Sequence, residues 1–192
     1  MLSYKESLKI LKETNALLDG HFILSSGLLS KQYIQCAKLL SHPKMAQMMC
    51  ASLCEKINNY FKKIDMILSP AIGGIVVGYE VGRQLNIETI FAERKDKKLI
   101  LRRDFKIPKN TNVLIVEDVI TTGKSAIECS NLIKESNAKL LGYACIIDRS
   151  NEKLLIKKEI ISQIKFEIKT FTENELPEDL KNIKFTKPGS RI

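Results

Sequence analysis

The chain has 192 residues, enough for one domain with a sizeable core, and its 44% apolar and 28% charged content is typical of a globular protein. No apolar run approaches the roughly 20 residues that a membrane-spanning helix needs. The amino terminus carries mixed charge from Lys5 and Glu6 onward, unlike a secretory signal. We therefore expect a cytoplasmic protein with no membrane partner.

The formal net charge of +9 invites comparison with nucleic-acid-binding proteins, in which clustered lysine and arginine neutralise phosphates. Here the cations are scattered over the whole length, and no basic run is interleaved with aromatic residues. We interpret them as a solvated lysine-rich surface and expect no nucleic-acid partner. The five cysteines form no Cys-x-x-Cys pair and there are only two histidines, His21 and His42, so the sequence does not predict a zinc site.

The hydrophobic pattern predicts strands that alternate with helices. In chain order we expect a helix over residues 4–18, a short strand at 33–35, a helix over 44–61, a strand at 66–69, a helix over 75–85, a strand at 88–92, short extended pieces at 99–101 and 105–107, a strand at 113–116, a helix over 122–137, and strands at 141–147 and 166–170. This alternation favours a mostly parallel sheet with helices on both faces. Ligands of such sheets bind beyond the carboxyl ends of the strands.

The strongest functional signal follows the predicted buried strand at residues 113–116. Two acids, Glu117 and Asp118, come directly after it, and the chain then enters a helix through Val119, Ile120, Thr121, Thr122, Gly123, Lys124 and Ser125. Backbone N–H groups of this turn, with the positive end of the helix, are suited to holding a phosphate. The two carboxylates are suited to holding ribose hydroxyls. We expect the turn to begin at Asp118, so that both acids approach the sugar.

The segment has two other possible interpretations. Its Gly-Lys-Ser end is similar to that of a nucleotide-triphosphatase P-loop, which needs a glycine five residues before the Gly-Lys pair. Asp118 stands at that position, and its charge would repel a triphosphate, so the P-loop is excluded. A purely structural strand end with a threonine cap is the second interpretation. The paired acids make the segment more specific than such a turn alone.

The segment resembles the phosphoribosyl-diphosphate (PRPP) motif of type I phosphoribosyltransferases. The resemblance implies a single α/β domain over residues 1–192, with a mostly parallel sheet flanked by helices. About residues 1–40 and the C-terminal tail would form a small hood over the base. It also implies a set of PRPP-binding residues: Arg94, Lys95, Lys98, Glu117, Asp118, Val119, Ile120, Thr121, Thr122, Gly123, Lys124 and Ser125.

Further segments resemble the orotate branch of this family. Residues 21–30 and 33–35 are similar to its amino-terminal substrate segment, and residues 187–191 to the tail of one bacterial subgroup. Gly73 and Gly74 would form the turn that approaches the pyrophosphate, where glycine lets the backbone come close. Arg149 would grip the carboxylate of orotate, and Thr121 would contact the same base. A surface ion pair with Asp148 or another acid is the alternative for Arg149.

The chain also departs from the orotate pattern. Ile72 and Gly73 stand where many orotate enzymes have a tyrosine-lysine pair, and Ser25 stands where they have a lysine. In the basic loop, Arg94, Lys95 and Lys98 match the expected positions, but Ile100 occupies the histidine position and the glycines are missing. The loop is therefore expected to be a shorter hairpin, and which of Lys97 and Lys98 reaches the site stays open. A solvated charged loop is the alternative.

By resemblance, the reaction joins orotate to PRPP and yields orotidine 5-monophosphate and pyrophosphate, a step of pyrimidine biosynthesis. Lys98, Glu117 and Asp118 are the expected catalytic residues. Mg²⁺ would be the cofactor, held mainly by PRPP with no direct protein ligand. The loop over residues 95–103 would close to exclude water. The resemblance also implies a homodimer.

Two other functions share the PRPP motif. A purine phosphoribosyltransferase of the adenine type would use another base, although Arg149 and the amino-terminal segment argue against it. A PRPP-sensing regulator would bind nucleic acid with a steep salt dependence and show little turnover. A base-specificity assay would distinguish the purine enzyme from an orotate enzyme. A nucleic-acid binding assay would identify the regulator.

Overall fold

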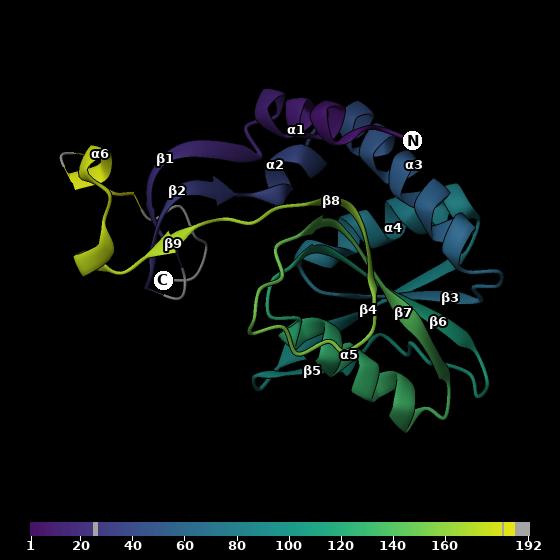
Figure 1. Cartoon of the computed structure of the whole chain (residues 1–192). Coiled ribbons are helices and arrows are strands. Elements are labelled where there is room, and N and C mark those ends of the chain that lie inside the picture. The colour runs from purple at the N-terminus through teal and green to yellow at the C-terminus, as the bar shows by residue number, and fades with distance from the viewer. Residues whose placement is uncertain (25–26, 182, 187–192) are drawn as a thin grey trace.

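The structure, a computed structural model, describes residues 1–24, 27–181 and 183–186, without the side chains of Glu173, Asp179 and Lys181. It contains two β-sheets (Figure 1). The larger has the order β5-β4-β3-β6-β7-β8. Its strands are β3 (Met66–Pro70), β4 (Glu88–Lys95), β5 (Lys98–Leu101), β6 (Asn112–Ile120), β7 (Lys139–Asp148) and β8 (Ile160–Lys165).

All neighbouring strands of the larger sheet are parallel except β5, which pairs antiparallel with β4. The carboxyl ends of β3, β6 and β7 therefore meet at one edge, at Pro70, Ile120 and Asp148. The prediction of a mostly parallel sheet is confirmed. The same edge carries the residues that were predicted to bind ligands.

Side-chain alternation along β6 divides the core into two layers. Leu114 and Val116 face a layer with helices α1 to α4, whereas Val113 and Ile115 face helix α5. Figure 1 shows α3 and α4 on one side of the sheet and α5 on the other. The helices are α1 (Tyr4–Glu13), α2 (Cys36–Leu40), α3 (Pro43–Tyr60), α4 (Gly73–Leu85) and α5 (Lys124–Glu135).

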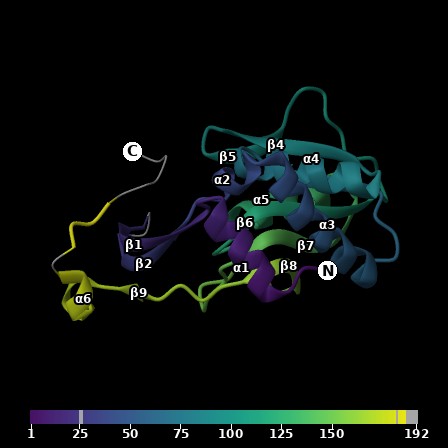
Figure 2. The ribbon, with the colours of Figure 1, turned by 90° about the horizontal axis from the view of Figure 1, so that it is seen from above.

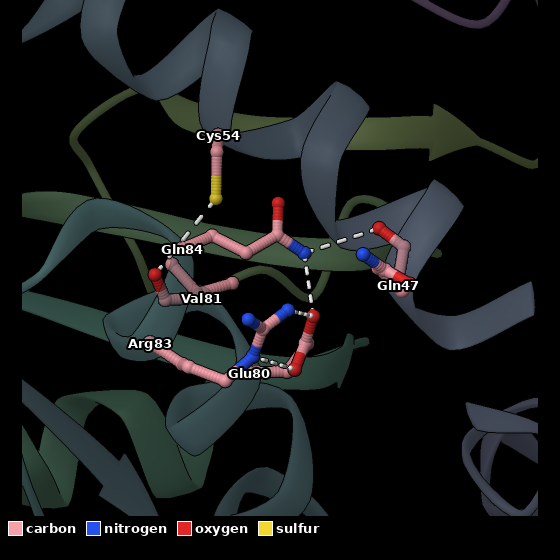
Figure 3. A network of polar contacts seen from close by, with 6 residues as sticks. All are labelled: Gln47, Cys54, Glu80, Val81, Arg83 and Gln84. Atoms are coloured by element: carbon pink, nitrogen blue, oxygen red, sulfur yellow. Dashed lines mark hydrogen bonds and ion pairs between the residues drawn. The ribbon is translucent and has the colours of Figure 1, made fainter. Parts of the chain in front are cut away.

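A polar network fixes α4 against α3 (Figure 3). Glu80 accepts two hydrogen bonds from the Arg83 guanidinium, at 2.9 and 2.8 Å, and one from the Gln84 amide. The Gln84 amide also donates to the backbone carbonyl of Gln47 on α3, at 3.1 Å. These hydrogen bonds from Arg83 and Gln84 lower the pKa of Glu80, so the carboxylate stays charged. Because α4 begins at Gly73, this network helps to set the position of the glycine turn.

The second sheet, with strand order β1-β2-β9, forms a hood that projects beyond the larger sheet (Figures 1 and 2). Its strands are β1 (Leu17–Ile23), β2 (Leu29–Ile34) and β9 (Thr170–Phe171), followed by the short helices η1 (Glu173–Glu175) and α6 (Glu178–Lys181). The buried His21 side chain bonds the Ile183 carbonyl at 2.7 Å, and Ile23 donates to the Thr186 carbonyl. The hood thus brings residues 17–23 and 29–34 together with residues 170–171 and 183–186, and the prediction that residues 1–40 and the C-terminal tail cover the base stays a prediction.

Some predicted elements differ in the structure. Helix α1 ends at Glu13 and not at residue 18, because Asn15 adopts a left-handed conformation and β1 starts at Leu17. Strand β8 was not predicted, because its polar Gln163 breaks the hydrophobic run. That side chain is buried and donates a hydrogen bond to the Ser7 hydroxyl. The predicted extended piece at 105–107 is not a strand.

Two predicted features fall on residues outside the described part of the chain. They are Ser25 in the amino-terminal substrate segment and the C-terminal run at 187–191. Within the described residues, no helix is long and apolar enough to cross a membrane.

Candidate active site

Strand β6 leads into a turn at residues 121–123 and then into α5. Gly123 is the N-cap of α5, with a φ of 74°, in the left-handed region that favours glycine. A Cβ at this position would also lie 2.7 Å from Ile156. No side chain caps this helix end, so the first N–H groups of α5 remain available to an anion.

A pocket of about 540 Å³ opens at this turn, and we call it the phosphate pocket. It is lined by Arg94, Lys97, Glu117, Val119, Thr121, Thr122, Gly123, Lys124 and Ser125. Most of the residues predicted to bind PRPP therefore gather here. Ile120 does not, because its side chain lies in the core and its carbonyl accepts the Arg149 N–H at 2.8 Å.

The acids Glu117 and Asp118 lie on opposite faces of the sheet. Glu117 lines the phosphate pocket beside α5. Asp118 faces the start of α4, where a Cβ on Gly73 would lie 2.7 Å from Asp118 Oδ1. The expectation that the turn begins at Asp118 is wrong, because β6 continues to pair with β7 as far as Ile120. The two acids thus reach the edge of the sheet as strand residues with alternating directions.

Burial raises the pKa of both carboxyl groups. The pKa of Glu117 rises to about 8, mainly through burial and secondarily through the negative charge of Asp118. Burial also raises the pKa of Asp118, although hydrogen bonds from the backbone N–H groups of Val119 and Asp118 oppose that effect. Such shifts mark carboxylates whose charged form lacks a compensating partner, a feature that clusters at functional sites.

The glycine turn after β3 brings backbone close to Asp118. Helix α4 begins at Gly73 without a side-chain cap, after a cis peptide between Ala71 and Ile72. A side chain at Gly73 would collide with the Asp118 carboxylate, and one at Gly74 would lie 3.0 Å from Pro70. The predicted pyrophosphate turn, Gly73 and Gly74, therefore needs glycine for steric reasons, and it leaves N–H groups facing the edge of the sheet.

A second pocket, of about 530 Å³, lies between the hood and the turn, and we call it the base pocket. Its lining includes Leu24 and Leu28 from the hood, residues 149–153 after β7, and residues 166–170. Thr121 and Thr122 line both pockets. A ligand that spans the two pockets would therefore bend around this Thr-Thr turn.

Arg149 lines the base pocket and is partly buried. Its Nε atom is buried and has no hydrogen-bond partner among the described residues. Burial lowers the pKa of Arg149, as expected for a cation without a paired anion. Asp148, the alternative partner, instead lies 3.8 Å from Lys165 and accepts the Ser150 N–H. A partly buried guanidinium that has no anionic partner among the described residues is suited to a carboxylate ligand.

The basic loop forms a short hairpin of β4 and β5. Arg94 reaches the phosphate pocket and pairs with Glu128 of α5 at 3.0 Å. Lys95 and Lys98 face each other across the hairpin, are exposed, and are not among the residues that line the phosphate pocket, whereas Lys97 is. The roles predicted for Lys95 and Lys98 stay predictions.

Comparison with known proteins defines the family. The chain matches the phosphoribosyl transferase domain over residues 36–179. It is 44% identical over 184 residues to the orotate phosphoribosyltransferase of Caldicellulosiruptor bescii, across 96% of each chain. The chain belongs to the orotate phosphoribosyltransferase family. The resemblance seen in the PRPP motif is confirmed.

Solved structures agree on the fold of this family. The orotate phosphoribosyltransferase of Aeropyrum pernix matches with a TM-score of 0.71 at 22% identity, over 82% of this chain and 92% of that one. The adenine phosphoribosyltransferase of Saccharomyces cerevisiae matches with a TM-score of 0.64 at 21% identity, over 82% and 99%. Orotate and adenine enzymes therefore share this fold, and the fold alone does not distinguish them.

Sequence reasoning missed one residue that shapes the orotate phosphoribosyltransferase site. Glu128 accepts hydrogen bonds from the Arg94 guanidinium and from the Leu99 N–H, and so attaches the hairpin to α5. It lies 34 residues from Arg94 and belongs to an ordinary amphipathic helix. No local pattern marks such a residue, because the contact exists only after the sheet has formed.

We predict that Glu117→Gln stabilises the Mg²⁺-free protein increasingly as pH rises from about 5 to about 9. The native carboxyl keeps its proton to about pH 8, whereas the unfolded one releases it near 4.5, so the native state binds more protons in this window. Wild-type stability therefore falls as pH rises, by about 1–4 kcal/mol in total. Glutamine does not ionise, so the variant does not lose this stability as pH rises.

The measurement is Tm by calorimetry across this pH range. Glu135→Gln, which changes an exposed carboxyl on α5, is the matched control. A Tm difference between Glu117→Gln and wild type that stays constant with pH would contradict the raised pKa.

Proposed function

We propose that the protein transfers the phosphoribosyl group of PRPP to orotate, giving orotidine 5-monophosphate and pyrophosphate. The observation that carries this proposal is Arg149, which lines a pocket beside the phosphate-binding turn and whose buried Nε has no hydrogen-bond partner among the described residues. Neutral purine bases have no carboxylate to pair with it. Orotate does, and its pairing would remove the cost of burying the cation.

Different residues of the site bind different parts of the substrate. The N–H groups and hydroxyls of residues 121–125 hold the 5-phosphate. Glu117 and Asp118 accept hydrogen bonds from the ribose hydroxyls, one from each face of the sheet. The backbone at Gly73 and Gly74 receives the pyrophosphate, and Arg149 and Thr121 align the base.

In the reaction, the bond from C1 of the ribose to the pyrophosphate oxygen breaks and the bond from C1 to N1 of orotate forms, with release of the N1 proton. Negative charge develops on the leaving pyrophosphate. Cations of the hairpin, Arg94, Lys95 and Lys98, stabilise that charge. No nucleophilic side chain is required, because orotate itself attacks. Orientation and electrostatics therefore supply the catalysis.

Mg²⁺ is the proposed cofactor, held mainly by oxygen atoms of PRPP. The oxygen-donor chemistry of the site fits this ion, and Asp118 at the glycine turn is the carboxylate that would contact it through water. When bound, Mg²⁺ neutralises charge on the leaving pyrophosphate. Because Glu117 and Asp118 lie on opposite faces of the sheet, they do not chelate one ion together.

We further propose a homodimer formed through α4. Ile72, Val76 and Tyr79 recur at helical spacing and are 86%, 50% and 64% exposed, and Met48 on the neighbouring α3 is 41% exposed. Exposed apolar side chains gathered in this way are typical of interfaces. The stripe starts beside Gly73, so a second copy seated there would lie next to the pyrophosphate turn.

Of the predictions that this proposal makes, the first tests the function. Purified protein with PRPP and Mg²⁺ should consume orotate, followed by its absorbance, and a chelator should abolish the reaction. Adenine and hypoxanthine, tested in parallel, should not be consumed. Consumption of a purine in place of orotate would overturn the interpretation of Arg149. No turnover with any base, together with nucleic-acid binding, would favour the PRPP-sensing regulator.

The second prediction concerns Arg149. Arg149→Ala should raise the KM for orotate by at least about 30-fold, because a buried bidentate partner of a carboxylate is lost. PRPP binding, measured by calorimetry without orotate, should change less than about threefold. Arg149→Lys should recover part of the loss, and Lys153→Ala, an exposed lysine of the same pocket, serves as the control. Equal losses for both substrates would contradict the assignment.

The third prediction concerns assembly. Tyr79→Glu should convert the dimer to a monomer in analytical ultracentrifugation, because a charge would be buried in an apolar interface. Leu155→Glu, which changes an exposed apolar residue away from α4, is the control and should leave the dimer intact. A wild-type monomer, or a Tyr79→Glu dimer of unchanged affinity, would count against this interface.

A further inference from the structure

The loop that follows β7 is attached to the phosphate turn by a backbone hydrogen bond. The Leu155 N–H donates to the Thr122 carbonyl at 2.9 Å. The loop begins at Arg149, whose own N–H donates to the Ile120 carbonyl at 2.8 Å. These two hydrogen bonds attach the loop to the end of β6 and to the turn itself. We call residues 154–156, which lie against the turn, the brace.

The hydrogen bond from Leu155 also determines where the next N–H of the turn points. The peptide between Thr122 and Gly123 is trans, so its carbonyl and its N–H point in opposite directions. Because the Thr122 carbonyl is directed at the brace, the Gly123 N–H is directed away from it. Gly123 lines the phosphate pocket, whereas the residues of the brace are not among those that line it. The Gly123 N–H is therefore suited to donate to an anion in that pocket.

The side chain of Ile156 fills the space beside Gly123. It is buried in the core layer that contains Ala126 and Cys129 of α5. A Cβ on Gly123 would lie 2.7 Å from Ile156 Cδ1 and 3.5 Å from Leu154 Cδ1. Gly123 has a φ of 74°, and a glycine has no Cβ of its own to restrict its backbone. Packing of the brace against this glycine therefore restricts the conformation of the turn.

Leu155 and Ile156 thus contact the same peptide in two different ways. The Leu155 N–H binds the carbonyl of Thr122, and the Ile156 side chain packs against Gly123, the residue that carries the N–H. The Leu155 side chain is 54% exposed, so burial of that side chain does not explain why the residue approaches the turn. A backbone donor and an apolar contact together set the orientation of this peptide.

We propose that the Leu155 N–H and the Ile156 side chain position the phosphate turn, by fixing the peptide between Thr122 and Gly123 with its N–H toward the 5-phosphate of PRPP. Ile156 is a positioning residue, because it acts through Gly123 and does not touch the substrate. This inference rests on the proposed function, since it assumes that PRPP occupies the phosphate pocket. It deepens that function by giving the loop that begins at Arg149 a second role, the orientation of a phosphate donor.

The first experiment compares Ile156→Val with Ile133→Val. The first change removes Cδ1, the atom nearest to the Gly123 position. The second removes the same atom from a fully buried residue of the same core layer, near the other end of α5, and is the matched control. Both variants should lower Tm by a similar amount, about 1–6 °C.

Only Ile156→Val should weaken PRPP binding, by about three- to tenfold in calorimetry without orotate, because a loosened glycine must be ordered when the phosphate binds. The kcat at saturating PRPP should stay within about twofold of wild type, since the brace does not contact the reacting atoms. Ile156→Leu, which keeps the number of side-chain carbons, should recover part of the PRPP affinity.

The Gly123 amide gives a direct measurement of the positioning effect. Labelling with 15N-glycine leaves a simple spectrum, because the chain has only 9 glycines. Inorganic phosphate should shift the Gly123 resonance of wild type. In Ile156→Val the half-maximal shift should need about three- to tenfold more phosphate, whereas Ile133→Val should follow wild type. A role in the core alone would lower Tm without changing this titration.

The Leu155 N–H is tested by an amide-to-ester substitution, in which the α-hydroxy analogue of leucine replaces Leu155. This change removes the donor and keeps the exposed side chain, and it should weaken PRPP binding by about three- to tenfold. The control is the same kind of substitution at Ala138, whose N–H donates to the Ile133 carbonyl at 3.1 Å. The control should change PRPP binding by less than about twofold.

The outcomes separate this inference from the function on which it rests. Unchanged PRPP affinity in Ile156→Val overturns the role of that side chain, and unchanged affinity in the Leu155 ester overturns the role of its N–H, while the proposed function stands. Equal losses in Ile156→Val and Ile133→Val would assign the effect to a loosened core and overturn the positioning role. A Gly123 resonance that ignores phosphate in protein that binds PRPP would overturn it too. If wild type does not bind PRPP at all, the inference and the proposed function are both overturned.

Discussion

The organisation of this site depends on the alternation of two acids at the end of the central strand. Because β6 continues to pair with β7 as far as Ile120, Glu117 and Asp118 point to opposite faces of the sheet. Each therefore meets a different helix start: Glu117 the phosphate turn of α5, and Asp118 the glycine turn of α4. A substrate that carries a phosphate and a pyrophosphate on one ribose suits this arrangement, since its sugar would lie over the strand end between the two anion sites.

Shared lining residues and a backbone hydrogen bond connect the base pocket to the phosphate pocket. Thr121 and Thr122 line both, and the Arg149 N–H donates to the Ile120 carbonyl directly before them. The cation proposed to recognise the base is therefore hydrogen-bonded through its backbone to the strand end that precedes the proposed phosphate turn. Specificity and orientation thus depend on the rigid edge of the sheet.

Much of this could be predicted from sequence, because the responsible signals are local. A buried strand, paired acids and a Thr-Thr-Gly turn lie within 13 consecutive residues, 113–125, and their hydrophobic pattern and turn chemistry indicate the same structure. The turn was nevertheless placed three residues early, at Asp118 and not at Thr121, because the pairing of β6 with β7, and not β6 alone, determines where the strand ends. Glu128 and strand β8 could not be found, since their partners are distant in sequence: Arg94 for the first, and Ser7 for Gln163 of the second.

The hairpin shows why a departure from a family pattern need not remove a function. A long glycine-rich loop must be ordered when substrate binds, at a cost in conformational entropy for each residue that becomes fixed. Here the connection is a two-residue turn, and Glu128 already attaches it to α5 in the ligand-free protein. Part of the ordering cost is therefore met during folding. The consequence is a site with less freedom to close over its ligand but with cations already held beside the phosphate turn.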